Sequence, residues 1–520
     1  MNEARSPFLP CWPPEVCGRE REREAITGAL DSGRGVLIVG PAGAGKSSLL
    51  EWAAWQATAR GAAVARAHTD GWLLGWLDLR ADEGEGNAWA QEALRHHASS
   101  GPGLNIERML TRASAEPLPS GEQMLETLTE ECLEVLRMLA RSERLERRLP
   151  QAWAEGVVSL CGRQPEGKML CLVVDEAHLA PDLPWAALTQ AEGLWLAVAC
   201  EDGPAAGEPA EVAQAAGLRV VRPGRLASRE VGETAAKRGG RTLAPGVAET
   251  VAARTDSSFA LMTWLQREGT NPQPSLLAAG LYLEECAQEE KEAAQAAALV
   301  PGWFAPGLIA AMLVRSPAGV EETLSRSSLF GRASEGEYAF AHPLFRSAAQ
   351  VTMTTDEAAS LHDKAGEWVL NQESSGAARA LGALSVHTHG ARHGGEGFQA
   401  NLAWARHCLA WGMWHRGLEA AERALICAAW EGSAAHQLGA MGQKATLLLA
   451  LGRDHDAARA ADRAASLARE AKMPLGEVWA LATRALALRQ VDRPRAAELL
   501  ARAVEIARPL KRAGLLDGLL

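Results

Sequence analysis

The stretch that decides the fold runs Gly40-Pro41-Ala42-Gly43-Ala44-Gly45-Lys46-Ser47. It follows an apolar run at residues 36–39 and precedes a helix-forming stretch at residues 48–59. A strand that turns sharply into a helix directs backbone N–H groups and the positive helix end at an anion, and glycines permit the tight turn. The pattern GxxxxGKS in this setting predicts a phosphate-binding loop within an α/β domain.

The same spacing assigns a role to each loop residue. We expect the backbone of residues 40–47 and of Ser48 to hold the phosphates of ATP or ADP, with Lys46 reaching the β- and γ-phosphates as a catalytic cation. The Ser47 hydroxyl is expected to ligate Mg²⁺. The alternative is a chance glycine turn, since the chain is rich in Gly and Ala.

A second acidic element completes this prediction. The apolar run at residues 170–174 ends in Asp175 and Glu176. We expect Asp175 to join Ser47 at Mg²⁺ and Glu176 to orient or deprotonate a catalytic water. The alternative for this pair is an ordinary strand end. Residues 175–178 also spell DEAH, but the chain offers no second RecA-like domain, so we expect His178 to start a helix rather than to serve a helicase.

Length and composition restrict the class of protein. A chain of 520 residues predicts three or four domains, and 47% hydrophobic with 22% charged residues is an ordinary globular composition. The net charge of −11 argues against a chain-wide nucleic-acid surface. The nine cysteines form no CxxC pair, and residues 1–14 are no secretory signal. These features predict a cytoplasmic protein with reduced thiols and without disulfides or structural zinc.

The expected fold is multidomain α/β plus α. Apolar runs predict strands of a parallel sheet at residues 35–39, 63–67, 169–174 and 194–199, with a mostly helical insert at 89–158. The predicted domains are a P-loop NTPase at 1–205, a helical lid at 206–275, a winged-helix-like unit with a hairpin near 329–340 at 276–370, and helical repeats at 371–520.

One uncharged stretch, residues 293–314, raises the question of a membrane helix. Pro301 and Pro306, each followed by glycine, divide it. We therefore expect two buried helices around a turn.

The last third of the chain repeats itself. Similar segments begin at Ala421, Ala461 and Leu500, which are 40 and then 39 residues apart, after turn-like stretches at 415–417, 452–454 and 491–494. This period predicts paired helices stacked as tetratricopeptide-like repeats, whose surface binds partners. The alternative is a plain alanine-rich bundle. Because the sequence ends on the apolar pair Leu519-Leu520 without a capping helix, we expect further sequence or a partner to follow.

These motifs together resemble a known family. Cys17-Gly18-Arg19-Glu20, the loop at 40–47 and the acids at 175–178 resemble the signal-transducing ATPases with numerous domains (STAND), in particular large LuxR-type regulators. Residues 338–346 and 361–365 resemble the family's winged-helix motifs "F-x-H-x-L-x-R" and "LH-x-x-A".

The resemblance implies further site residues and a function. It implies that Val16, Gly18 and Arg19 contribute to the adenine pocket, and that His342 touches the β-phosphate of ADP and holds a closed state. The alternative for His342 is simple packing beside Pro343. The implied function is a nucleotide-controlled switch in transcription, with a protein or small-molecule signal on the repeats and nucleotide-dependent self-association. No helix-turn-helix resembling that of the family precedes Leu520, so direct DNA binding is not expected of this sequence.

Two departures from the family pattern concern hydrolysis. Ala199-Cys200-Glu201 stands where the family often has an Arg that senses the γ-phosphate, and residues 255–259 replace a glycine-asparagine-proline element under the adenine. We therefore expect ATP or ADP to bind with Mg²⁺ and hydrolysis to be slow or absent. Two other functions stay open: an ATPase that remodels or loads a partner protein, and a repeat scaffold with a structural nucleotide.

Three histidines suggest a metal site. His387, His389 and His393 lie in or beside the Gly-rich stretch 390–397, with Glu396 nearby. Because metal sites need fixed ligands, we expect a surface loop or an interrupted helix here rather than a metal site.

Overall fold

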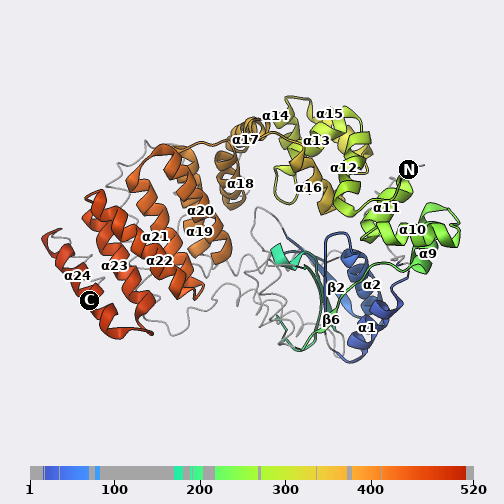
Figure 1. Ribbon diagram of the computed structural model, residues 1–520, viewed down its shortest axis with the longest axis horizontal. Helices are drawn as coiled ribbons and strands as arrows, with labels where there is room; N and C mark the ends of the chain where they lie inside the picture. The colour runs from blue at the N-terminus through green and yellow to red at the C-terminus, as the bar shows by residue number, and fades with distance from the viewer. Residues whose placement is uncertain are drawn as a thin grey trace. The chain divides into compact units, whose positions relative to one another are not determined.

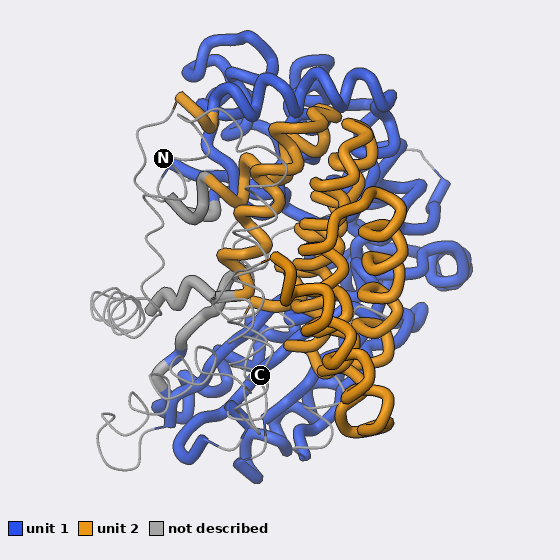
Figure 2. The backbone as a smooth tube through the Cα atoms, turned by 90° about the vertical axis from the view of Figure 1, so that its left-hand side faces the viewer, with its two compact units in different colours: residues 1–99, 150–368 blue, residues 100–149, 369–520 orange. Residues whose placement is uncertain are grey.

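The computed structural model describes residues 16, 18–33, 35–69, 77–81, 169–179, 188–189, 191–202, 217–267, 271–334, 336–371, 377–410 and 413–510. The chain divides into two compact units, residues 1–99 with 150–368 and residues 100–149 with 369–520 (Figure 2). The helical insert predicted at 89–158 lies outside the described residues.

The first unit contains a six-stranded sheet in the order β3-β2-β4-β5-β1-β6. All neighbouring strands are parallel except β2 and β3. The predicted parallel α/β sheet is therefore confirmed. Its strands are β1 (Val36–Gly40), β2 (Ala63–Thr69), β3 (Leu77–Ala81), β4 (Leu170–Val174), β5 (Leu194–Glu201) and β6 (Arg219–Val221).

Two of these strands were not predicted. β3 pairs antiparallel with β2 at one edge, and β6 pairs parallel with β1 at the other. β6 has only three residues, too few to show a periodic pattern, and pairing with β1 defines it. Because β6 lies beyond residue 205, the sheet of the nucleotide domain continues past the predicted domain end.

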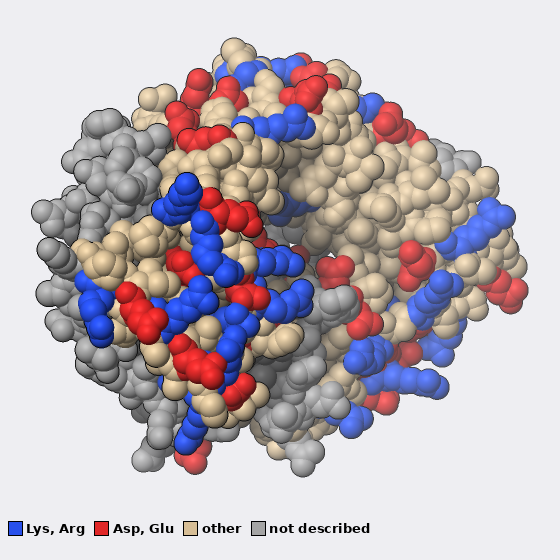
Figure 3. Space-filling model, turned by 60° about the vertical axis from the view of Figure 1, so that its left-hand side comes forward, with Lys and Arg blue, Asp and Glu red and all other residues tan. Residues whose placement is uncertain are grey.

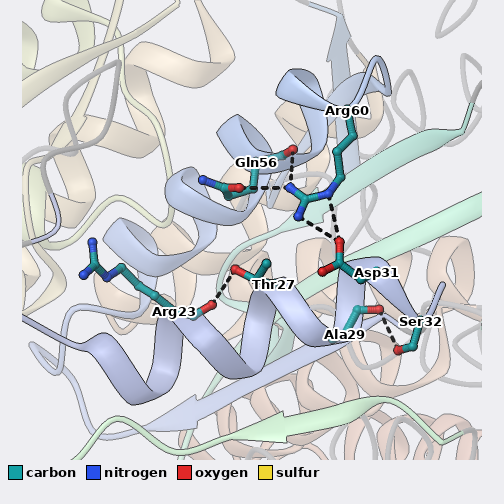
Figure 4. Close-up of polar contacts among 7 residues, drawn as sticks. All are labelled: Arg23, Thr27, Ala29, Asp31, Ser32, Gln56 and Arg60. Carbon is teal, nitrogen blue, oxygen red and sulfur yellow. Dashed lines mark hydrogen bonds and ion pairs between the residues drawn. The ribbon is translucent and has the colours of Figure 1, made fainter.

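Among the described residues, two helices pack with this sheet, α1 (Glu20–Asp31) and α2 (Lys46–Ala59), which lie side by side (Figure 1). Their buried residues, such as Ile26 and Leu50, join those of β1, β4 and β5 in one apolar core. The far ends of the helices are tied by Arg60, whose Nε and Nη2 donate to Asp31 Oδ1 over 3.1 and 2.8 Å (Figure 4).

Helices follow the sheet, as predicted. Leu226, Val231, Val251 and Leu261 belong to a second apolar cluster in the first group of helices. This group is α9 (Ser228–Gly239), α10 (Pro245–Arg254) and α11 (Ser258–Gln266). The next group is α12 (Ser275–Glu285), α13 (Gln288–Ala298), α14 (Pro306–Leu313), α15 (Pro317–Arg326), β7 (Phe330–Ser334), β8 (Glu337–Phe340), α16 (Pro343–Val351) and α17 (Thr355–Leu370).

The second group has the helix and hairpin order of a winged helix. β7 and β8 form an antiparallel hairpin, and Phe304 adds a bridge to Tyr338. The stretch 293–314 contains parts of α13 and α14 separated by a turn, so the prediction of two buried helices is confirmed. Among the described residues, no helix has both the length and the apolar character needed to cross a membrane.

The described part of the second unit consists of successive helices that pack on their neighbours (Figure 1). The repeated segments lie in every other helix, α20, α22 and α24, where Ala424, Ala464 and Ala503 are fully buried. Helical repeats are therefore confirmed. The helices are α18 (Ala377–Gly390), α19 (Gly395–Ala410), α20 (Trp414–Glu431), α21 (Ala434–Ala450), α22 (Asp454–Glu470), α23 (Pro474–Leu488) and α24 (Arg493–Ala507).

One predicted turn was wrong. Residues 415–417 lie inside α20, because the Gly417 amide already donates to the Met413 carbonyl over 2.9 Å in helical fashion.

On the face that Figure 3 shows, charged residues of both signs are interspersed, and some pair across helices, as Lys444 and Glu422 do over 2.8 Å. Such mixed charges are typical of solvated helix faces.

Candidate functional site

The predicted phosphate-binding loop joins β1 to α2. All five residues of β1 are buried, and the chain turns at Gly43 and Gly45 with φ of 81° and 88°. These left-handed conformations favour glycine because a side chain would be strained there. The turn places the N-terminus of α2, whose first N–H groups have no partner within the helix, at the carboxyl end of the sheet. This geometry fits a phosphate group.

Lys46 is folded back on its own loop. Its Nζ donates to the carbonyl oxygens of Gly40 and Pro41, each over 2.9 Å. Burial lowers the pKa of Lys46, while the charges of Asp175, Glu201 and Glu176 act in the opposite direction. The lysine predicted from the motif therefore lies within the field of three carboxylates.

The acidic pair lies where it was predicted, directly after the buried strand β4. Asp175 Oδ1 accepts the backbone N–H of Glu176 over 2.9 Å, and Glu176 has a φ of 50°. Burial, and next the charge of Asp175, raises the pKa of Glu176 to about 7. A carboxyl with this pKa is able to exchange a proton near neutral pH.

A third acid, Glu201, was not predicted as a site residue. Glu201 at the end of β5 pairs in register with Gly40 of the loop. Its backbone N–H donates to His178 Nδ1 over 3.3 Å, and its carboxylate lies 3.6 Å from His178 Nε2. His178 itself lies in a short 3-10 turn, Ala177–Leu179, and thus links the acidic pair to the end of β5. Beside it, burial raises the pKa of the Cys200 thiol to about 12.

The helix α11 packs directly on the loop. The backbone N–H of Phe259 donates to the Gly43 carbonyl over 3.1 Å. A Cβ at Gly43 would lie 2.8 Å from Phe259 Cβ and 2.9 Å from Ser257 Oγ. Glycine is therefore required at this position both by the turn and by the close approach of α11.

The predicted site residue His342 lies beyond Phe259. The two rings have centroids 4.2 Å apart, and His342 Nδ1 accepts the N–H of Leu344 over 3.2 Å at the start of α16. Burial, and next the charge of Lys46, lowers the pKa of His342 to about 3. His342 thus packs on Phe259 and caps α16, which agrees with the alternative of simple packing. It also lies where the charge of Lys46 affects its pKa.

One turn further along α16, Arg346 also acts on the site. Its Nε donates to the Ala298 carbonyl over 3.1 Å. Burial lowers the pKa of Arg346, and the charge of Glu176 opposes that shift. The sequence motif "F-x-H-x-L-x-R" contains this arginine, but only the folded chain brings it to the acidic pair.

Of the residues expected at the adenine, Val16 packs against the core of the sheet domain, and Arg19 is buried at the start of α1. The Arg19 guanidinium donates to the carbonyls of Gly224 and Ala44 over 2.6 and 3.1 Å. Contact of Val16, Gly18 and Arg19 with a base stays a prediction.

The histidine cluster lies at an interrupted helix, one of the two arrangements expected from the sequence. His387 and His389 lie within α18, with His387 fully buried, and only His393 lies in the short connection to α19. Gly390 ends α18 and Gly395 begins α19, so the connection at 391–394 interrupts the helices within the Gly-rich stretch. The described residues contain no group of three or more His, Cys, Asp or Glu side chains that could hold a metal ion.

The match to a family model agrees with this geometry. Residues 15–192 match the family model of the AAA ATPase domain. No curated protein matches the sequence.

Several solved structures match this chain at low sequence identity and with TM-scores below 0.5. A STAND protein with a tetratricopeptide repeat sensor from Pyrococcus horikoshii has 13% identity and a TM-score of 0.44, over 99% of this chain and 80% of that chain. Cdc6p from Pyrobaculum aerophilum has 12% identity and a TM-score of 0.30, over 70% and 98%. The Thermotoga maritima RuvB Holliday junction branch migration motor has 14% identity and a TM-score of 0.25, over 62% and 91%.

The assignment rests on the family match together with the loop, the acidic pair and the parallel sheet. Residues 15–192 match an AAA ATPase domain of the P-loop type, a kind of domain that implies nucleotide binding, and helical repeats follow in the same chain.

Proposed function

We propose that this chain is a signal-transduction switch of the STAND type, controlled by ATP and ADP, with transcriptional regulation as its output. The observation that carries the proposal is the position of Phe259. Its backbone is bonded to Gly43 of the phosphate-binding loop and its ring packs on His342 of the winged-helix unit. A change in the loop therefore reaches the winged helix through one residue.

The nucleotide site uses residues that the sequence predicted. The backbone of residues 40–48, in which every residue but Pro41 offers an N–H group, holds the phosphates together with the Lys46 ammonium. To reach them, Lys46 releases the carbonyls of Gly40 and Pro41. Ser47 and Asp175 supply oxygen ligands suited to Mg²⁺, which when bound neutralises phosphate charge. Glu176 is to orient the water, and Val16, Gly18 and Arg19 are to contribute to the pocket for the base.

The closed state is held by α16. The Lys46 charge acts on His342 and helps to keep its ring uncharged, and Phe345 packs on Phe259 with ring centroids 5.1 Å apart. We infer that ADP is retained while these contacts last, and that ATP with a signal on the repeats favours an open, self-associating form. The signal is a protein or a small molecule, and the protein acts in the cytoplasm.

Slow hydrolysis follows from the groups at the end of β5. Cys200 and Glu201 supply no cation where an arginine would stabilise the γ-phosphate. The buried Arg346 provides a guanidinium near Glu176, but from α16, which belongs to the closed state. In the closed state the acidic pair thus has the Arg346 cation in addition to that of Lys46.

Nucleotide binding is tested with Lys46→Ala. We expect its ADP affinity to fall about 10- to 100-fold, because a charge-assisted contact with phosphate is lost. Lys237→Ala, an exposed lysine on α9, is the matched control and should bind ADP like the wild type. Unchanged affinity in Lys46→Ala would overturn the proposal.

The switch itself is tested by the mass of the chain without nucleotide, with ADP and with a non-hydrolysable ATP analogue. A higher mass with the analogue alone supports a switch. Equal masses in all three would favour a scaffold with a structural nucleotide. Phosphate release approaching about one per second would favour a working ATPase instead.

A further inference from the structure

Arg19, which directly precedes α1, makes contacts that reach well beyond that helix. Arg19 is only 4% exposed. Its Nη2 donates to the Ala44 carbonyl of the phosphate-binding loop over 3.1 Å. Its Nη1 donates to the Gly224 carbonyl, ahead of the lid helix α9, over 2.6 Å. One side chain therefore joins the loop to the chain that enters the lid.

The backbone of the same residue is bound to the lid as well. The Arg19 N–H donates to Glu230 Oε1 over 2.6 Å, and the other carboxylate oxygen of Glu230 accepts the Ala227 N–H at the start of α9 over 2.7 Å. The preceding residue leaves room for this contact. Gly18 has a φ of 65°, and a Cβ there would lie 2.6 Å from Glu230 Oε1.

The chemistry of the contacts requires arginine. Its planar guanidinium presents donors in two directions at once, whereas a lysine ammonium is a single point at the end of a flexible stem. The buried charge is balanced by Glu22, whose Oε1 accepts from Nη1 over 3.1 Å. A lysine at this position would keep the charge but could not hold the carbonyls of Ala44 and Gly224 together.

The helix that carries Arg19 is also fixed at its other end. Asp31, the last residue of α1, is bound by Arg60, which directly follows α2 (Figure 4). α1 is thus held on the nucleotide domain at one end, and at the other it touches both the loop and the lid. Movement of the lid relative to the loop has to break or shift the contacts of Arg19.

We propose that Arg19 is a positioning residue that couples the conformation of the phosphate-binding loop to the position of α9. This inference rests on the proposed nucleotide-dependent function and names the part of the chain that transmits it to the lid. A ligand that changes the loop at Ala44 changes an acceptor of Arg19, and through Gly224 it changes the lid. By linkage, the lid position alters ligand affinity by the same factor.

The test is hydrogen exchange of the full chain with and without ADP, read at the loop (40–48) and at α9 (228–239). In the wild type we expect ADP to slow exchange at both places, by about tenfold at α9, as a coupling of ordinary size allows. At saturating ADP, which offsets a loss of affinity from the predicted base contact of Arg19, Arg19→Lys should keep protection of the loop but lose most of the protection at α9. Arg21→Ala, an exposed arginine on the same helix, should behave like the wild type.

The readout separates coupling from a merely structural role. A structural role would raise exchange of α9 equally with and without ADP and leave the effect of ADP unchanged. If Arg19→Lys does not fold, Glu230→Gln replaces it. Its amide offers one acceptor oxygen where the carboxylate offers two, so the ADP effect at α9 should again shrink.

Two results would overturn the inference in different ways. Full ADP protection of α9 in a folded Arg19→Lys and in Glu230→Gln would refute the coupling alone. Absence of ADP protection at the loop of the wild type would refute the proposed function, and the coupling with it.

Discussion

The nucleotide site and the helical repeats are stabilised in opposite ways. The site is assembled from single groups that have no substitute, such as the left-handed Gly43 and the buried Arg19 with its three acceptors. The repeats pack on small residues that recur, such as the buried Ala424 and Ala464, and each helix contacts its neighbours in sequence. A stacked array distributes its stability over many similar contacts. We therefore expect single substitutions to abolish function in the first unit and to weaken only local packing in the second.

The largest effect is expected at Gly43. In Gly43→Ala the new Cβ meets Phe259 Cβ and Ser257 Oγ at less than contact distance, and the φ of 81° is strained for alanine. Backbone strain and overpacking together should cost about 2–4 kcal/mol and prevent ADP binding. Titration calorimetry with ADP and thermal unfolding measure both effects.

The control for this substitution is Gly28→Ala in α1. Gly28 has open space around its Cβ position and no positive φ. Alanine favours a helix by about 1 kcal/mol over glycine, so this variant should be as stable as the wild type or more so. If Gly43→Ala binds ADP like Gly28→Ala, the close contact between loop and α11 is not needed for the site.

The second prediction concerns acid and the repeats. Burial lowers the pKa of His407 in α19 from an ordinary 6.5 to about 4. Below pH 6.5 His407 is therefore protonated in the unfolded chain, whereas in the folded chain it is protonated only below about pH 4. The free energy of unfolding should fall across this interval by up to about 3 kcal/mol and level off below it.

Denaturant titrations at several pH values, read by hydrogen exchange in α19 and α20, measure this loss. His407→Phe removes the titrating group while keeping an aromatic ring beside Trp404, which stacks on His407 with centroids 5.1 Å apart. Its stability should depend less on pH between 6.5 and 4. An equal acid dependence in both proteins would show that other groups cause the loss.

The same two regions show what sequence can and cannot predict. The loop and the acidic pair were predicted because each is a contiguous pattern, and the repeats because the sequence resembles itself at a fixed period. The partners of Arg19 were not predicted, because Glu230 is 211 residues away along the chain. Arg346 was missed as a site residue for the same reason, since only packing of α16 brings its charge to Glu176.

The smallest effect is expected inside the repeats, with Ala424→Leu in α20. Ala424 is fully buried, so the added carbons must displace neighbouring side chains, at a cost of about 2 kcal/mol. Ala429→Leu on the exposed side of the same helix is the matched control and should change stability by less than about 0.5 kcal/mol. Because each helix of the array packs mainly on its neighbours in sequence, the loss should appear chiefly in α19, α20 and α21 by hydrogen exchange, and ADP affinity should stay unchanged. A loss of ADP affinity in Ala424→Leu would mean that packing of the repeats already controls the nucleotide site, and the contrast between the two regions would then fail.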